Sequence, residues 1–212
     1  PLSDIGEPPT GGAVDAAELG LDSNARKDYQ KAQSALEKRN FDEARKLLAR
    51  TIERAPKFAG AHMRLGVTEL LTGNFERARA EFQEAIDLDP RKADAHFGLA
   101  KALNLLNRPG EALAVAEKGL ELQPHAAEGL FERSRAQFSL RDYPAAERTA
   151  RAALAETPPP PPEIHLILGN CYLNLRRYND AASEISAYLK LAPNSASAEQ
   201  VKTTLAKLKA AG

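Results

Sequence analysis

The sequence has little of what marks disulfide-stabilised, membrane-spanning or strongly charged proteins. It holds a single cysteine, Cys171, which excludes a disulfide within the chain and gives no firm indication of redox compartment. No apolar run approaches the roughly 20 residues that a membrane-spanning helix needs. Lys plus Arg and Asp plus Glu number 29 each. With no net charge to draw the whole chain toward nucleic acid or an anionic membrane, local patches must carry any electrostatic recognition.

The motifs that carry catalysis are also missing. The chain has no Gly-rich phosphate loop, no metal-ligand spacing and no set of nucleophile and base. Cys171 has no motif partner and falls in a column of small residues, so we interpret it as a structural thiol rather than a nucleophile. The sequence therefore predicts no enzyme activity, no cofactor and no metal.

The composition indicates an all-helical protein. Val and Ile are sparse, whereas Ala, Leu, Glu, Arg and Lys are common and charged residues make up 27% of the chain. The stretch Ala59–Lys92 shows the pattern clearly: apolar spacings predict one helix over 59–72 and a second over 75–88, with a break at Gly73 and Asn74. Such a hairpin cannot bury both of its faces alone, so it predicts similar neighbours on either side.

Those neighbours are visible as a ladder of prolines with separations of 34, 34, 34 and 35 residues: Pro56, Pro90, Pro124, Pro158 and Pro193. An alanine stands twelve residues before each proline, at Ala44, Ala78, Ala112, Ala146 and Ala181. A further column holds only small residues, which let two helices approach closely: Ser34, Thr68, Ala102, Ala136 and Cys171.

With these residues in place, the chain resembles the tetratricopeptide repeat family. The likeness covers residues 25–195 and is clearest in the last unit, where the signature positions are His165, Leu168, Gly169, Tyr172, Ala181, Tyr188 and Pro193. The resemblance implies a right-handed all-α solenoid, a superhelix of antiparallel helical hairpins. The five repeats are 25–58, 59–92, 93–126, 127–161 and 162–195, within a domain of 23–195.

The two ends depart from the repeat. Residues 1–22 are acidic, contain prolines and glycines and have no Lys or Arg, so we expect a flexible tether, which could also fold back onto the array. Residues 196–212 carry a weak apolar stripe that predicts a single capping helix. The prolines at 158–162 predict a stiff polyproline connector; a ligand for an aromatic-lined domain is the alternative interpretation.

Three histidines, His62, His96 and His165, share one repeat position. Because equivalent residues of neighbouring repeats lie about a helix diameter apart, their rings cannot converge on one metal ion, and packing is the favoured interpretation.

The family's geometry implies a concave surface lined by the first helix of each repeat. Its principal inward residues are large and apolar: Tyr29, Met63, Phe97, Phe131 and Leu166. Beside them are expected Gln33, Arg64, Lys101, Asn104, Arg135, Phe138 and Asn170. An apolar stripe with polar and basic neighbours is typical of a groove for a peptide or a partner helix, and Lys101 with Arg135 would favour an acidic or C-terminal group. The alternative is that these side chains only pack within the fold.

We therefore predict a non-catalytic scaffold or adaptor. The double substitution Phe97→Ala with Phe131→Ala is expected to abolish partner capture while leaving the melting temperature intact. The carboxylate clamp of chaperone-binding relatives is absent, since Asp94, Glu128, Glu132 and Glu163 stand where its cations would be. Two other roles stay open: a self-associating or structural module of a bacterial envelope assembly, and the regulatory part of a longer enzyme.

The segments 24–29 and 188–194 are similar to exported bacterial repeat proteins in which the array follows a signal and a small domain. This similarity favours the periplasm or cell surface of a bacterium over the cytoplasm. The first residue is Pro1 rather than Met, so we expect that an upstream segment has been removed.

Overall fold

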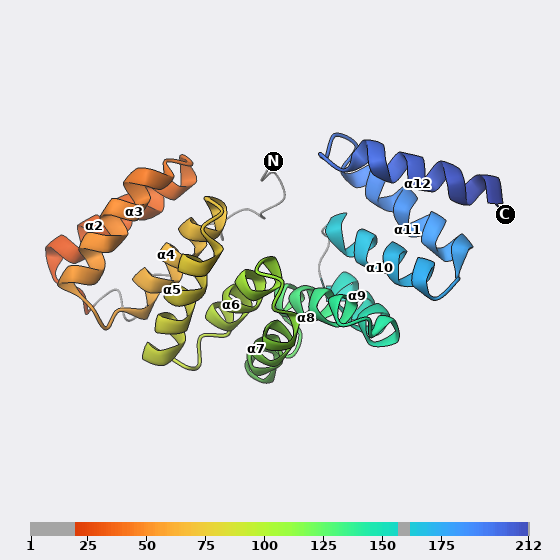
Figure 1. Ribbon diagram of the computed structural model, residues 1–212. Coiled ribbons are helices and arrows are strands. Elements are labelled where there is room, and N and C mark those ends of the chain that lie inside the picture. The colour runs from red at the N-terminus through yellow and green to blue at the C-terminus, as the bar shows by residue number, and fades with distance from the viewer. Residues whose placement is uncertain (1–19, 157–161, 212) are drawn as a thin grey trace. The chain divides into compact units, whose positions relative to one another are not determined.

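The computed structural model describes residues 20–156 and 162–211, with side chains up to residue 208 (Figure 1). All regular structure in these residues is α-helical, which confirms the predicted all-α class. The helices are α2 (Ser23–Glu37), α3 (Phe41–Arg54), α4 (Ala59–Leu71), α5 (Phe75–Leu88), α6 (Ala93–Leu105), α7 (Pro109–Leu122), α8 (Ala127–Ser139), α9 (Tyr143–Glu156), α10 (Pro162–Asn174), α11 (Tyr178–Leu191) and α12 (Ala198–Ala211).

The helix boundaries follow local signals in the sequence. The side chain of Asp22 accepts hydrogen bonds from the backbone amides of Asn24 and Ala25, which caps α2. Pro109 opens α7, where a missing N–H costs nothing. The same reasoning corrects the predicted polyproline connector at its last residue: Pro162 is the first residue of α10. The rest of that run, residues 158–161, lies outside the described part of the chain.

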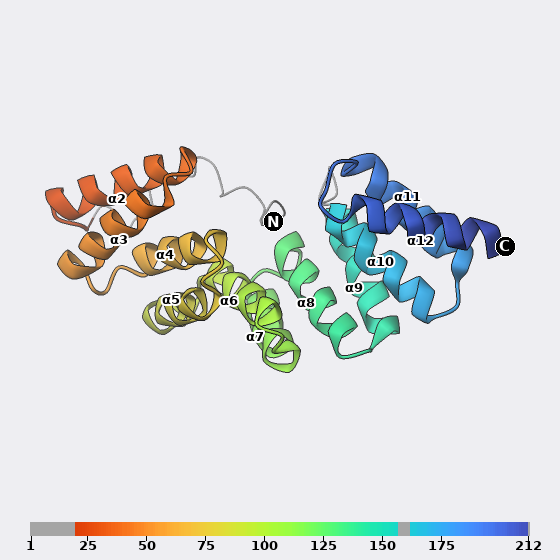
Figure 2. The same cartoon turned by 45° about the horizontal axis from the view of Figure 1, so that its top comes forward.

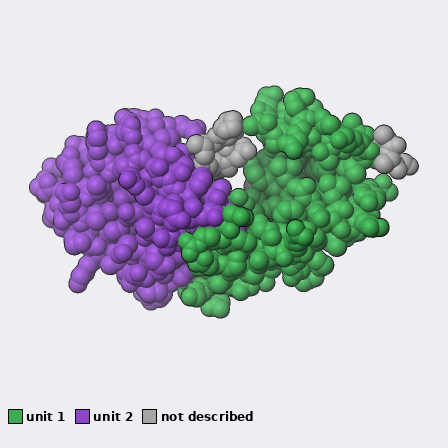
Figure 3. All heavy atoms as spheres, viewed as in Figure 1, with its two compact units in different colours: residues 1, 107–212 green, residues 2–106 purple. Residues whose placement is uncertain are grey.

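The chain divides into two compact units, which we call the N-terminal unit (2–106) and the C-terminal unit (107–212) (Figure 3). In the N-terminal unit the hairpins α2–α3 and α4–α5 pack against each other through α3 and α4, and α5 packs against α6. In the C-terminal unit α8–α9 and α10–α11 are the hairpins, and α12 packs on α11 (Figure 2). Each unit is thus a stack of helices in contact with their sequence neighbours, as expected of an α-solenoid.

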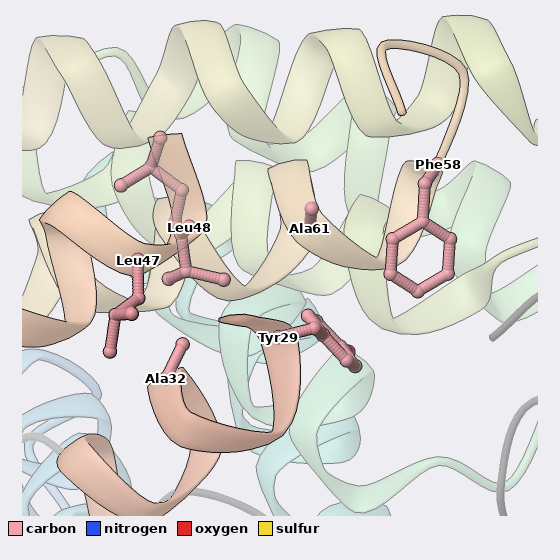
Figure 4. Packing of buried hydrophobic residues seen from close by; sticks show 7 residues of the cluster. Tyr29, Ala32, Leu47, Leu48, Phe58 and Ala61 are labelled. Carbon is pink, nitrogen blue, oxygen red and sulfur yellow. The ribbon is translucent and has the colours of Figure 1, made fainter. Parts of the chain in front are cut away.

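The N-terminal core lies between the first two hairpins. One buried cluster comprises Tyr29, Ala32, Leu47, Leu48, Phe58, Ala61 and Leu65, most of them labelled in Figure 4. Farther along, the ring of Phe82 lies against Gly66 of its own hairpin and Gly98 of α6. A Cβ atom on Gly98 would overlap that ring, so glycine is required for α6 to approach α5.

The turns between paired helices share one backbone conformation. Gly73 has a φ of 80°, in the left-handed region that glycine adopts without strain. The equivalent turns place other residues there, namely Arg39 (φ 55°), Asn107 (57°), Arg141 (65°) and Arg176 (59°). The packing of the flanking helices therefore imposes the turn even where the sequence supplies no glycine.

Helix α12 lies within the predicted 196–212 segment. Ala198 is buried against the preceding hairpin, whereas Val201, Leu205 and Leu208 are half-buried. The hydroxyl of Tyr188 contacts those of Ser195 (2.9 Å) and Ser197 (2.8 Å), which fixes the turn into α12. At the other end, residues 1–19 of the predicted tether lie outside the described residues. No helix in the described residues is long and apolar enough to cross a membrane.

Candidate partner-binding surface

In the N-terminal unit, the predicted groove residues fall into two groups. Tyr29 and Phe97 are interior residues, with 4% and 1% of their surface exposed. The Tyr29 ring meets Phe58 edge-on at a centroid distance of 4.9 Å (Figure 4). The Tyr29 hydroxyl accepts a hydrogen bond from Nε of Arg64 at 3.5 Å. The others are half-buried and reach the surface: Gln33, Met63, Arg64, Lys101 and Asn104.

The burial of Phe97 corrects the predicted effect of the double alanine variant. Truncating a fully buried phenylalanine leaves a cavity that costs about 3–5 kcal/mol of stability. A variant with Phe97→Ala therefore cannot keep its melting temperature, and it tests the core rather than a binding surface.

In the C-terminal unit, all five predicted residues reach the surface. Phe131, Arg135 and Phe138 lie on α8 and Leu166 and Asn170 on α10, two helices in direct contact. The three large apolar side chains are half-buried and Asn170 is exposed. We call these five residues the α8–α10 face. Half-exposed aromatic and aliphatic groups are the kind of anchor that interface hot spots use.

The positive charge of the α8–α10 face is partly neutralised within the protein itself. The guanidinium of Arg135 lies 5.7 Å from the centre of the Phe131 ring. One of its terminal nitrogens lies 3.3 Å from both carboxylate oxygens of Glu132, a buried residue. Arg135 is thus held in place and partly neutralised before any ligand arrives. Lys101 belongs to the other unit, so its joint action with Arg135 stays a prediction.

The histidine column has a more specific role than packing. Nδ1 of His62 lies 2.9 Å from Oε2 of Glu81, and Nδ1 of His165 lies 2.6 Å from Oε2 of Glu184. Each pair joins the two helices of one hairpin at the same spacing of 19 residues. The hydrogen bond to Glu81 raises the pKa of His62 against the effect of burial. His96 instead contacts the backbone oxygen of Pro90 at 3.0 Å.

Metal-binding clusters and an accessible thiol are both lacking in the described part of the chain. No group of three or more His, Cys, Asp or Glu side chains could hold a metal ion within them. Cys171 is fully buried, and burial raises the pKa of its thiol to about 12. A thiol with that pKa is not a nucleophile at neutral pH, in agreement with its interpretation as a structural residue.

Comparison with known protein families identifies the repeat from which this helical array is built. The family model described as tetratricopeptide repeat matches residues 29–90, 72–127 and 131–196, which together span most of the chain. The chain belongs to the tetratricopeptide repeat family. Its repeats are thereby those of a family that generally provides non-catalytic scaffolds for protein–protein interaction.

Solved tetratricopeptide repeat structures share the fold at low sequence identity. PilW, described as a type IV pilus biogenesis factor, aligns with a TM-score of 0.79 at 18% identity over 90% of this chain and 88% of PilW. PilF of Pseudomonas aeruginosa aligns with a TM-score of 0.74 at 19% identity, covering 89% and 86%. YrrB, described as having an unusual peptide-binding site, aligns with a TM-score of 0.65 at 17% identity, covering 90% and 100%. No curated protein sequence matches the chain significantly.

Sequence reasoning missed the polar contacts that join successive tetratricopeptide repeats. Arg45 of α3 donates from Nε to Oε1 of Glu69 on α4 at 2.7 Å, although Glu69 is only 3% exposed. Arg151 of α9 donates from Nε to the hydroxyl of Tyr172 on α10 at 3.0 Å. Glu69 and Tyr172 occupy the same repeat position in their helices. A buried acid at a position where the family places an aromatic residue was the signal that could have revealed the first contact.

Proposed function

We propose that this chain is a non-catalytic interaction module that binds a peptide or a helix of a partner protein along the α8–α10 face. The observation that carries the proposal is the presence of three half-exposed large apolar side chains, Phe131, Phe138 and Leu166, on two adjacent first helices. Tyr29 and Phe97, which share the repeat position of Phe131 and Leu166, are buried instead.

The chemistry of the face sets the kind of ligand. The apolar groups offer anchoring contacts for two or three apolar side chains of an extended peptide or amphipathic helix. Asn170 is exposed and can hydrogen-bond the ligand backbone, and Arg135 can share its remaining N–H groups with a ligand carbonyl or carboxylate. Because Glu132 already offsets part of the charge of Arg135, we expect selection for apolar anchors more than for acidity.

Relatives add support only for the fold. YrrB is described as having a peptide-binding site, and PilW as a pilus biogenesis factor, but identities below 20% carry neither role to this chain. The periplasm or cell surface of a bacterium is retained as the proposed location, on the sequence similarity alone.

Peptides selected from a random library on the immobilised full chain provide the test. We expect Phe131→Ala with Leu166→Ala to weaken the affinity of the selected peptides by about 100-fold, as expected for two hot-spot anchors. Tyr178→Ala removes a similarly large exposed side chain from α11, a second helix, and serves as the matched control. Fluorescence anisotropy gives the dissociation constants, and circular dichroism checks that each variant is folded. Equal affinities for the wild type and the double variant would show that the ligand binds elsewhere.

A further inference from the structure

The first hairpin carries a hollow between α2 and the start of α3. It is lined by Lys31, Ser34, Ala35 and Lys38 of α2 together with Asn40, Glu43 and Leu47 at the start of α3, and its volume is about 470 Å³. We call it the end hollow. Ala35 and Leu47 form a buried apolar floor, and both lysines are exposed at the rim.

The equivalent surface of α4 is covered. The four lining residues of α2 correspond, at the repeat spacing of 34, to four residues of α4: Leu65, Thr68, Glu69 and Thr72. The first three of these are buried. The cover is α3, the second helix of the preceding hairpin. Its Arg45 donates from Nη2 to the hydroxyl of Thr72 at 3.1 Å as well as from Nε to the Glu69 carboxylate at 2.7 Å.

The C-terminal unit repeats this arrangement. The equivalent residues of α10 include Leu168, Cys171 and Tyr172, each exposed by 1% or less. Here α9 is the covering helix, and its Arg151 bonds the Tyr172 hydroxyl. In both units, therefore, the second helix of one hairpin covers this side of the first helix of the next hairpin. For α2, no helix of the described residues precedes it.

The end hollow differs in chemistry from its covered counterparts. Lys31 and Lys38 stand where α4 has Leu65 and Thr72. Neither lysine forms an ion pair with a carboxylate among the described residues, and Glu43 is the only acid in the lining. Two unpaired cations above a small apolar floor fit an occupant that carries acidic groups beside small apolar ones.

We propose that the end hollow is filled by residues 1–19 of the same chain, which take the place of the missing second helix. Leu21 packs against the same buried cluster as Ala55, the residue that directly follows α3. Since these two residues are 34 positions apart, the repeat register aligns residues 13–20, which follow the prolines and glycines at 8–12, with residues 47–54 of α3. Val14 and Ala17 then correspond to Leu48 and Thr51, both fully buried in α3.

The charge and the length of residues 1–19 are compatible with binding in the end hollow. The segment carries Asp4, Glu7, Asp15 and Glu18 and no Lys or Arg, so it complements Lys31 and Lys38. Lys38 lies about 24 Å along α2 from its start, and 19 residues span up to about 60 Å when extended. The segment thereby caps the open end of the stack, a role that terminal elements of repeat arrays commonly have.

Disulfide trapping in the full chain tests this inference independently of the peptide-binding face. Val14→Cys is combined with Ser34→Cys in the end hollow or, as the matched control, with Gln33→Cys one residue away on the predicted groove side. Native Cys171 does not interfere because burial suppresses its ionisation. Under mild oxidation we expect rapid intramolecular disulfide formation for the Ser34 pair and little for the Gln33 pair.

Charge reversal supplies the second readout. Lys31→Glu with Lys38→Glu should slow trapping at Ser34 by about fivefold to tenfold at low salt, while Lys46→Glu on the exposed side of α3 should not. Faster trapping at Gln33 would mean that the segment lies in the groove. Disulfide-linked dimers through Ser34 would assign the hollow to a second copy, and slow trapping in both pairs would leave the segment outside it. Each of these three results overturns the proposal.

Discussion

His62 is held between two acceptors, which favour its protonated form. Glu81 accepts from Nδ1 at 2.9 Å, and the backbone of Pro56 also favours the charged ring. Only the imidazolium form donates from both ring nitrogens, so the folded state raises the pKa of His62 above its ordinary value of about 6.5. The sequence identified the histidine column but not its glutamate partners, because a partner 19 residues away follows from hairpin geometry rather than from any motif.

This arrangement predicts a pH-dependent contribution to stability. Because the folded pKa is raised, the contribution is fully present below about pH 6.5 and is lost as the pH rises through the folded pKa. Urea unfolding of the wild type and His62→Gln at several pH values checks it. Their difference in unfolding free energy should shrink as the pH rises above about 6.5, and a difference that stays constant above that pH would contradict the expectation.

Cys171 is expected to be inert in the folded protein. Its thiol is buried and its pKa is raised to about 12, so almost no thiolate exists at pH 8. Ellman's reagent should label it only after unfolding, at the rate at which the C-terminal unit opens. Labelling of the native protein as fast as that of a free cysteine would show that the small-residue column is open at this position.

At the scale of helices, the contact between α3 and α4 includes a buried ion pair beside its apolar cluster. Glu69 is 3% exposed and is bonded by Arg45 and by the amide of Asn74 at 2.6 Å. Burial acts to raise the pKa of Glu69, but these hydrogen bonds offset it and lower the pKa overall. The acid is therefore charged at neutral pH and needs its partner.

Breaking that pair should destabilise the N-terminal unit. Arg45→Ala leaves a buried carboxylate without its main donor and is expected to cost about 2 kcal/mol or more. The double variant Arg45→Met with Glu69→Leu removes both charges and should recover most of that loss. Denaturant unfolding of the two single variants and the double variant gives the comparison. A double variant as unstable as Arg45→Ala would show that packing, not the unpaired charge, dominates.

The helices of the hairpins were largely predictable from the sequence, whereas the backbone conformation of the turns between them was not. The proline ladder places each second helix, and α5 has the predicted bounds Phe75–Leu88, while α4 ends at Leu71, one residue before the predicted end. Arg39, Arg141 and Arg176 in left-handed turns could not be foreseen, because nothing in an arginine favours that backbone. Tertiary packing overrides the local preference there.

For the molecule as a whole, the division into two units limits what the repeat pattern can say about binding. A strict repeat predicts five equivalent anchors, yet Tyr29 and Phe97 are buried while Met63, Phe131 and Leu166 reach the surface. Equivalent positions differ because each ring fits the space that its own neighbours leave: Tyr29 has Phe58 beside it, an aromatic contact that the repeat signature does not specify. The α8–α10 face keeps its anchors accessible within one unit.

The position of a bound peptide tests the central claim most directly. A photo-crosslinking amino acid is placed at Asn170, exposed on α10, or at Tyr178, exposed on α11, and the full chain is irradiated with a library-selected peptide. The account predicts that the peptide is captured at residue 170 and not at residue 178, and that excess unlabelled peptide prevents the capture. Capture at residue 178 with none at residue 170 would contradict the assignment of the first-helix face as the binding surface.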